Sequence, residues 1–134
     1  RKNLLLFFEN GKVARLDLAS YETKTNRKKL INAYCDKSPL AAVYMIGEEI
    51  DIAVFSSDGR ALVFNTTLLQ LKTSRTTQGV AVMNLKKNHK LISAAPLTDT
   101  VIKNVSRYRV RSLPAAGALL RDEDRGETQM SLID

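Results

Sequence analysis

Hydrophobic and polar residues alternate along this chain in short runs, a pattern typical of β-strands rather than of helices. Residues 4–8 are an apolar run with high β-propensity, and apolar and polar side chains alternate along residues 13–18. The Asn10-Gly11 pair between them predicts a two-residue type I′ turn, because both central positions of that turn need positive φ angles. The first part of the chain is therefore predicted to form a β-hairpin.

The same pattern returns later in the chain as an internal repeat. Residues 3–12 align without a gap on residues 51–60, an offset of 48 residues (51 − 3). The register holds into the polar stretches that follow, at residues 24–27 and 72–75. A period of this length is typical of propeller blades or solenoid units, and such proteins usually bind partners through the surface that their stacked units form. We therefore expect a second hairpin, with its turn at Asp58-Gly59, and a binding face.

Short apolar or alternating runs predict further strands at residues 40–46, 80–85, 91–95 and 105–113. In the last run, Arg107, Arg109 and Arg111 would share one face, because side chains on a strand alternate between its two faces. Residues 66–71 and 115–121 each have room for one or two turns of helix, and no segment shows a long helical period. An all-β fold is predicted.

Charge divides the chain into a basic body and an acidic end. Residues 1–113 contain 19 Lys and Arg against 9 Asp and Glu, a net +10, whereas residues 114–134 contain 2 against 5, a net −3. The second part starts with a Pro-Ala-Ala-Gly break, and its acidic run cannot bury apolar area, so we predict a flexible acidic C-terminal tail. The tail is either an ordinary frayed terminus or an interaction tail.

The basic body points to a polyanionic partner, with nucleic acid ahead of a membrane surface. Composition leaves open a second interpretation, in which Lys and Arg keep a β-protein soluble and protect its strand edges.

No apolar run approaches the roughly 20 residues that span a bilayer, and no signal peptide is visible. Cys35 is the only cysteine, which excludes an internal disulfide and fits a reducing, cytoplasmic setting. The missing initiator Met favours a piece of a longer protein, ending at its natural C-terminus.

Residues suited to catalysis or metal binding are scarce. With one His and one Cys, the chain cannot form a His/Cys metal cluster, and it has no glycine-rich phosphate loop. His89 lies among lysines in a predicted turn, and the carboxylates are not paired for acid–base chemistry. We therefore predict no catalytic residue, no metal site and no cofactor in this chain.

Basic clusters are the remaining chemical signal, and they occupy predicted loops and the last predicted strand. Lys and Arg beside Ser, Thr and Asn are the side chains that contact phosphates. Few aromatic residues, and no Trp, are available to stack single-stranded bases. We predict contacts to the backbone phosphates of double-stranded DNA, with strong salt dependence; the alternative is that the clusters are only solvated turns. The predicted DNA-binding residues are Lys24, Arg27, Lys28, Lys29, Lys72, Arg75, Lys86, Lys87, Arg107, Arg109 and Arg111.

Four stretches carry a family resemblance: residues 4–15 (LLLFFENGKVAR), 21–34 (YETKTNRKKLINAY), 51–64 (DIAVFSSDGRALVF) and 73–85 (TSRTTQGVAVMNL). They resemble the C-terminal repeats of bacterial type IIA topoisomerase A subunits, the family that includes DNA gyrase and topoisomerase IV. The resemblance implies a β-pinwheel of propeller-like blades whose neighbours exchange strands. It also implies a DNA-binding rim, for which the matching positions are Lys24, Arg27, Lys28, Lys29, Lys72 and Arg75.

The resemblance sets the expected organisation as well. Residues 1–113 are predicted to hold the β-pinwheel repeats, with repeat one at about 3–50, repeat two at about 51–98 and a closing strand at 101–113. Two blades cannot close a ring, so we expect either an open fragment or one whose exposed edges pair with another copy. The Gln-Arg-Arg-Gly-Gly-Lys-Gly box of gyrase is absent. Its absence favours a topoisomerase IV-like or divergent protein, or a chain that omits that blade.

The expected function is a non-catalytic DNA-binding and bending module that guides the duplex to the cleavage core of a bacterial type II topoisomerase. The resemblance implies that ATP and Mg²⁺ act through other domains and subunits of this cytoplasmic, chromosome-associated parent. Tyr108 follows an Arg, as the cleaving tyrosine of the family does, but no carboxylate cluster for Mg²⁺ accompanies it, so it is not predicted as a nucleophile. The alternative function is a β-repeat module whose basic loops bind an acidic protein.

Overall fold

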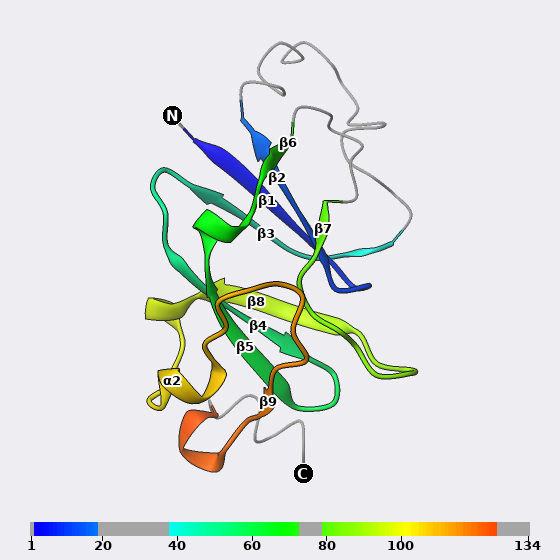
Figure 1. Cartoon of the computed structure of the whole chain (residues 1–134), viewed down its shortest axis with the longest axis vertical. Coiled ribbons are helices and arrows are strands. Elements are labelled where there is room, and N and C mark those ends of the chain that lie inside the picture. Colours follow the sequence, from blue (N-terminus) through cyan, green and yellow to red (C-terminus); the bar gives the residue numbers. More distant parts are fainter. Residues whose placement is uncertain (1, 19–37, 73–78, 126–134) are drawn as a thin grey trace.

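The computed structural model describes residues 2–18, 38–72 and 79–125, which form two β-sheets (Figure 1). The first sheet has the order β3-β1-β2-β6, with β7 also paired to β2. Its strands are β1 (Asn3–Phe8), β2 (Lys12–Asp17), β3 (Leu40–Ile46), β6 (Leu71–Lys72) and β7 (Val80–Ala81). The second sheet has the order β8-β4-β5-β9. Its strands are β4 (Asp51–Ser56), β5 (Arg60–Asn65), β8 (Leu91–Pro96) and β9 (Ala118–Leu119).

Helical structure in the described ranges is limited to single turns. Three are 3₁₀ turns: η1 (Thr66–Leu68), η2 (Leu97–Asp99) and η3 (Asp122–Asp124). The fourth is the short α-helix α2 (Val105–Tyr108), which packs against β5. The prediction of an all-β fold is confirmed.

The repeat in the sequence is a repeat of sheet topology. Each repeat begins with an antiparallel hairpin, β1–β2 or β4–β5, and adds a third strand, β3 or β8, antiparallel to the first strand of the hairpin. The pairing is irregular at the same repeat position in both sheets, at Phe7/Phe8 and at Phe55/Ser56. The predicted hairpins and the predicted strands at residues 40–46 and 91–95 are therefore confirmed.

The outer strands of each sheet come from later in the chain. β6 and β7 follow the second hairpin, yet both pair with β2 of the first sheet, β6 parallel and β7 antiparallel. In the second sheet the outer position beside β5 belongs to β9. This exchange of strands ties the second repeat to the first, as the resemblance implied.

The hairpin turns differ from the predicted type. Asn88 is the only non-glycine residue with a positive φ among the described residues, so neither Asn10 nor Asp58 has the type I′ conformation. Gly11 and Gly59 do have positive φ angles, 87° and 82°, and their N–H groups donate to the carbonyl groups three residues earlier. Each turn is thus a three-residue loop with glycine in the left-handed position, the next most common hairpin connection.

One hydrophobic core joins the two sheets. Leu5 and Phe7 of the first sheet belong to the same buried cluster as Ile52, Val54 and Phe64 of the second. A second cluster on the other face of the second sheet includes side chains of β4 and β5 together with Tyr108 and Leu120. Because both faces of β4 and β5 are covered, their sequences are nearly continuous apolar runs.

The predicted strand at residues 105–113, part of the predicted closing strand 101–113, is wrong. Residues 105–108 form α2 instead, and only Arg109 makes a β-bridge, to Val63. Val105 and Tyr108 both pack into the cluster on the second sheet. Residues three apart share one side of a helical turn but lie on opposite faces of a strand, so this packing selects the helix.

Three other predicted elements are shorter or different. Of the predicted strand at residues 80–85, only β7 is formed, although Met83 bridges to Ala115. The helix considered at residues 66–71 is reduced to η1, where the Asn65 side chain accepts a hydrogen bond from the Thr67 N–H at 3.0 Å. The helix considered at residues 115–121 is absent, because β9 pairs with β5 there.

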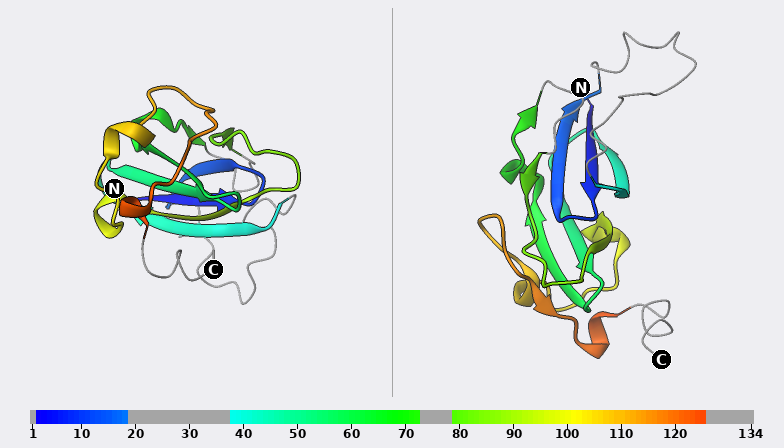
Figure 2. Two further views of the ribbon diagram at one scale, coloured as in Figure 1. Left: turned by 90° about the horizontal axis from the view of Figure 1, so that it is seen from below. Right: turned by 90° about the vertical axis from the view of Figure 1, so that its right-hand side faces the viewer.

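The prediction of a flexible tail from residue 114 is wrong for residues 114–125. This segment runs along the second sheet beside β5 (Figure 2) and ends in η3, where Asp124 is buried. Arg60 and Ala61 of β5 are the register partners of β9. Residues 126–134 of the predicted tail lie outside the described residues.

Candidate nucleic-acid interface

Five of the predicted DNA-binding residues belong to connections outside the described ranges. Lys24, Arg27, Lys28, Lys29 and Arg75 lie outside the described residues. Four of them belong to the long connection between β2 and β3, and Arg75 belongs to the connection between β6 and β7. Their role therefore stays a prediction.

Lys86 and Lys87 lie on the exposed connection between β7 and β8. The end of this connection is held against the β4–β5 turn, where the Ser57 N–H donates to the Lys90 carbonyl at 2.8 Å and the Lys90 N–H donates to the Ser57 hydroxyl at 3.0 Å. Neither Lys86 nor Lys87 forms an ion pair within the described ranges, whereas Lys90 lies 3.7 Å from Glu9. The loop thus presents two ammonium groups that no described carboxylate pairs with, and its end is hydrogen-bonded to the β4–β5 turn.

Lys72 occupies a different environment. It ends β6, is half-buried, and is the register partner of Leu16 of β2. The backbone position of Lys72 is therefore fixed by the strand exchange between the two repeats.

The three arginines predicted to share one strand face do not do so. Arg107 lies on α2, while Arg109 and Arg111 lie on the irregular segment that follows it. Arg109 is paired with the Asp51 carboxylate through two hydrogen bonds of 3.2 and 3.1 Å, and these bonds, helped by Asn65, lower the pKa of Asp51. Arg111 is exposed and has no ion-pair partner in the described part of the chain. Only Arg107 and Arg111 of the three therefore have guanidinium groups that no carboxylate neutralises there.

Arg15 links the two repeats and is not available to a ligand. Its guanidinium donates to both carboxylate oxygens of Glu49, at 2.9 and 3.0 Å, and to the carbonyl oxygen of Thr66 at 2.8 Å. The hydrogen bonds from Arg15 and then from the Thr66 hydroxyl lower the pKa of Glu49. Because β2 carries Arg15 while Glu49 and Thr66 flank the second hairpin, this network fastens one sheet to the other.

A buried acid fixes the C-terminal segment to α2. Asp124 accepts hydrogen bonds from the backbone N–H groups of Lys103 and Asn104, at 2.6 and 3.0 Å, and from the Tyr108 hydroxyl at 2.7 Å. Burial alone would raise the pKa of Asp124, but the hydrogen bonds, that of Tyr108 first, outweigh it and lower this pKa to about 2. Burial, together with the bond to Asp124, raises the pKa of Tyr108. Tyr108 is thus a buried structural residue.

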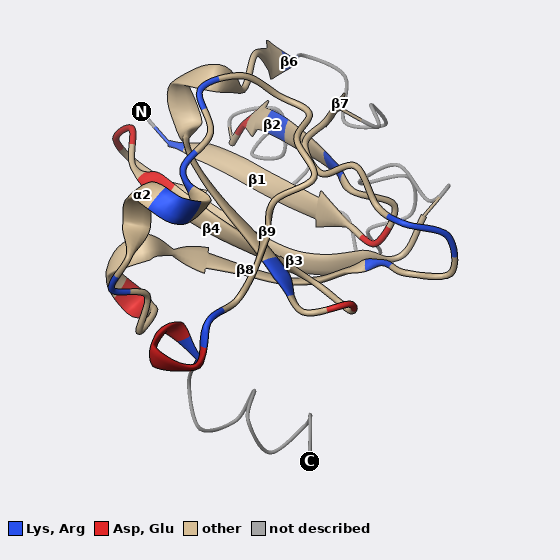
Figure 3. Cartoon of the chain, turned by 60° about the horizontal axis from the view of Figure 1, so that its bottom comes forward, with Lys and Arg blue, Asp and Glu red and all other residues tan. Residues whose placement is uncertain are grey.

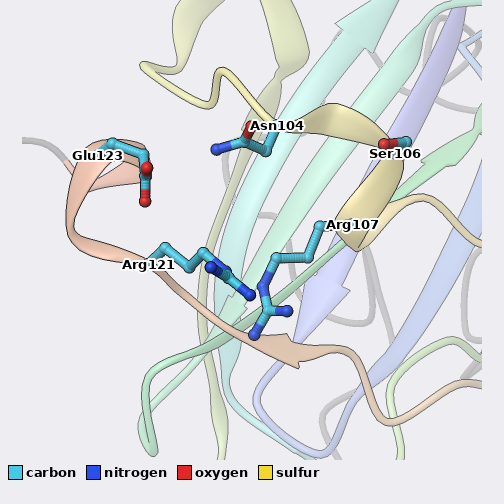
Figure 4. Close-up of a pocket in the computed structure, with 5 residues that line it drawn as sticks. All are labelled: Asn104, Ser106, Arg107, Arg121 and Glu123. Atoms are coloured by element: carbon cyan, nitrogen blue, oxygen red, sulfur yellow. The ribbon is translucent and has the colours of Figure 1, made fainter.

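This anchoring creates a recess that the sequence did not predict. The recess has a volume of about 470 Å³, and its lining residues are Asn104, Ser106, Arg107, Arg121 and Glu123 (Figure 4). Arg121 was missed because it stands in an acidic run that looked like a solvated tail. The only sequence signal is that arginines flank this run, at Arg121 and Arg125.

Neither a metal cluster nor a membrane-spanning helix occurs in the described ranges. Over residues 2–18, 38–72 and 79–125, no group of three or more His, Cys, Asp or Glu side chains could hold a metal ion. Over the same ranges, no helix has the length and apolar character needed to cross a bilayer.

The sheet topology and its exchanged strands define a β-pinwheel, and comparisons with known proteins agree. Residues 51–98 match the family model described as the DNA gyrase C-terminal domain, beta-propeller. This range holds the second hairpin, both exchanged strands β6 and β7, and β8. Among curated proteins, none matches the sequence of this chain.

Three solved structures with a similar fold are the C-terminal domains of DNA topoisomerase IV, of DNA gyrase A and of E. coli ParC. The C-terminal domain of DNA topoisomerase IV has a TM-score of 0.72 and 17% identity, with 88% of this chain and 41% of that chain covered. The DNA gyrase A C-terminal domain has a TM-score of 0.69 and 20% identity, with 92% of this chain and 46% of that chain covered. The E. coli ParC C-terminal domain has a TM-score of 0.64 and 13% identity, with 91% of this chain and 55% of that chain covered.

The family-model match and the structural matches thus confirm the β-pinwheel fold that the family resemblance implied. Its repeats are of the kind found in the C-terminal domains of DNA gyrase A and of the topoisomerase IV protein ParC. The chain spans about half the length, or less, of the solved domains that it matches.

Proposed function

We propose that this chain is a non-catalytic module that binds and bends duplex DNA for a type IIA topoisomerase. The family-model match over residues 51–98 carries the proposal, because that family is the C-terminal domain of DNA gyrase. The module would act in the bacterial cytoplasm, next to the chromosome, and would guide the duplex to the cleavage core. ATP and Mg²⁺ would be used by other domains and subunits of the parent enzyme.

Backbone phosphates are the proposed contact. Figure 3 shows Lys and Arg along the connection between β7 and β8 and around α2. Unpaired cations on loops and turns of a rigid β-scaffold can neutralise phosphates without reading bases, and the fixed scaffold would set the curvature of the DNA path. Besides Lys86, Lys87, Arg107 and Arg111, the proposed contacts include Lys72, Lys24, Arg27, Lys28, Lys29 and Arg75, with Arg109 acting only if its pair with Asp51 opens.

Charge reversal on the β7–β8 connection tests this mechanism. We expect Lys86→Glu with Lys87→Glu to weaken binding to several unrelated duplexes by the same factor, because phosphate contacts carry no sequence information. Fluorescence anisotropy with labelled duplexes of random sequence measures the effect. Lys2→Glu, on an exposed lysine that is not among the proposed contacts, serves as the control. Loss of affinity for one sequence alone would show that backbone recognition is the wrong mechanism.

The same assay separates DNA from an acidic protein as the partner. A DNA-binding module should hold duplex DNA in the presence of a moderate excess of heparin, a polyanion without duplex geometry. If heparin at the same moderate excess displaces all of the DNA, the chain recognises negative charge alone, which is what a module for an acidic protein partner would do.

A further inference from the structure

The recess between α2 and the C-terminal segment brings two positive charges together. Figure 4 shows the guanidinium groups of Arg107 and Arg121 pointing toward one another at its edge. Like charges placed this close raise the electrostatic free energy of the fold unless water screens them or an anion binds between them. We call this site the arginine recess.

Most of the other described arginines are paired with a described carboxylate, but Arg107 and Arg121 are not. Four arginines of the described ranges form an ion pair with a carboxylate: Arg15, Arg60, Arg109 and Arg125. Within those ranges Arg107 and Arg121 form none, although Glu123 lines the same recess. Their charge is therefore not neutralised by the described protein groups around them.

Both arginines are hydrogen-bonded near the β9 edge of the second sheet. Arg107 donates through Nε and Nη2 to the Leu119 carbonyl oxygen, at 3.3 and 3.1 Å, and its guanidinium lies 5.8 Å from the centroid of the Tyr108 ring. The Tyr108 hydroxyl accepts a hydrogen bond from the Arg121 N–H at 3.0 Å. Arg107 is thus held in place before any ligand arrives, which reduces the entropy lost on binding.

We infer that the arginine recess binds a phosphate group. Guanidinium groups bind phosphate through charge-assisted, often bidentate hydrogen bonds, and two of them can share the oxygens of one phosphate. The phosphate belongs either to the backbone of duplex DNA or to a free small molecule. If the phosphate belongs to DNA, the inference rests on the proposed function. It then adds Arg121, which was not predicted from the sequence, to the proposed DNA contacts.

The first arm of the test uses inorganic phosphate with the full chain. Phosphate is titrated against chloride at constant ionic strength while backbone amide shifts are recorded by NMR. We expect saturable shifts at residues 104–107 and 119–123. They should disappear in the Arg107→Gln, Arg121→Gln double variant and persist in Lys2→Gln, which removes one charge from an exposed position elsewhere. Circular dichroism confirms that each variant is folded.

The second arm uses duplex DNA and the single variants. We expect Arg107→Gln and Arg121→Gln each to lower affinity about tenfold, the usual size for a hydrogen bond to a charged group. The double variant should lose clearly less than the product of the two factors, because both side chains hold the same phosphate. Glu123→Gln should raise affinity, since it removes the negative charge that lines the recess.

The outcomes separate the recess from the proposed function. Phosphate shifts together with unchanged duplex affinity in the arginine variants would assign the recess to a free phosphate compound. Phosphate shifts in a chain that binds no duplex would overturn the proposed function and still support the recess. No phosphate shifts at residues 104–107 and 119–123, together with duplex affinities that neither arginine substitution alters, would overturn the inference.

Discussion

Asp124 shows how one buried carboxylate orders a segment whose sequence looks disordered. The residue is 1% exposed, and a buried charge costs free energy unless hydrogen bonds compensate it. The N–H groups of Lys103 and Asn104 and the Tyr108 hydroxyl provide that compensation. Because these donors lie 16 to 21 residues earlier in the chain, no local pattern around the acidic run could predict the contact.

The pKa of Asp124 predicts an acid-sensitive fold. The folded pKa of about 2 lies below the ordinary value of 3.8, so this group stabilises the fold fully above pH 3.8 and loses its contribution as the pH falls toward 2. The linked free energy is about 2 kcal/mol. Urea unfolding at pH 5 and at pH 2 should show that Asp124→Asn is destabilised at pH 5 and loses less stability than wild type on acidification. Asp122→Asn, on a 92% exposed side chain, should follow wild type. Equal acid losses in wild type and Asp124→Asn would contradict this account of Asp124.

At the scale of elements, the sequence predicted what local chemistry decides. Glycine after Asn or Asp, between apolar runs, was enough to locate both hairpins, although not the turn type. The helix α2 could not be predicted, because Val105 and Tyr108 become helical through packing on a sheet that lies elsewhere in the chain. The exchange of β6 and β7 likewise depends on contacts between repeats, and only the family resemblance pointed to it.

Substitution of Gly79 tests whether the exchanged strand β7 packs closely against β2. It has a φ of 80°, and a Cβ atom there would overlap the carbonyl group of Val13 on β2. We expect Gly79→Ala to lower the free energy of unfolding by about 3 kcal/mol or more, because backbone strain adds to a clash that pushes β7 from β2. Gly59→Ala is a matched control with a φ of 82° and no atom within 4 Å of the added Cβ. It should cost only about 1 kcal/mol. Similar losses in thermal or urea unfolding would contradict close packing of β7 on β2.

At the scale of the whole molecule, two repeats behave as one body. The hydrophobic core spans both sheets, Arg15 connects the first sheet to Glu49 and Thr66, and β6 and β7 cross from the second repeat to the first. A rigid unit of this kind can hold cations at fixed spacing. Of the predicted DNA-binding residues, the sequence located exposed Lys86 and Lys87 correctly on a loop, but it could not foresee that Arg109 would be neutralised by Asp51.

The central claim is that this body binds duplex DNA through backbone phosphates, and the salt dependence of affinity tests it most directly. Anisotropy titrations of one duplex across a series of salt concentrations give the slope of log affinity against log salt. For roughly 4–8 phosphates at about 0.9 each, we predict a slope between about −4 and −7. A slope near zero would contradict the claim.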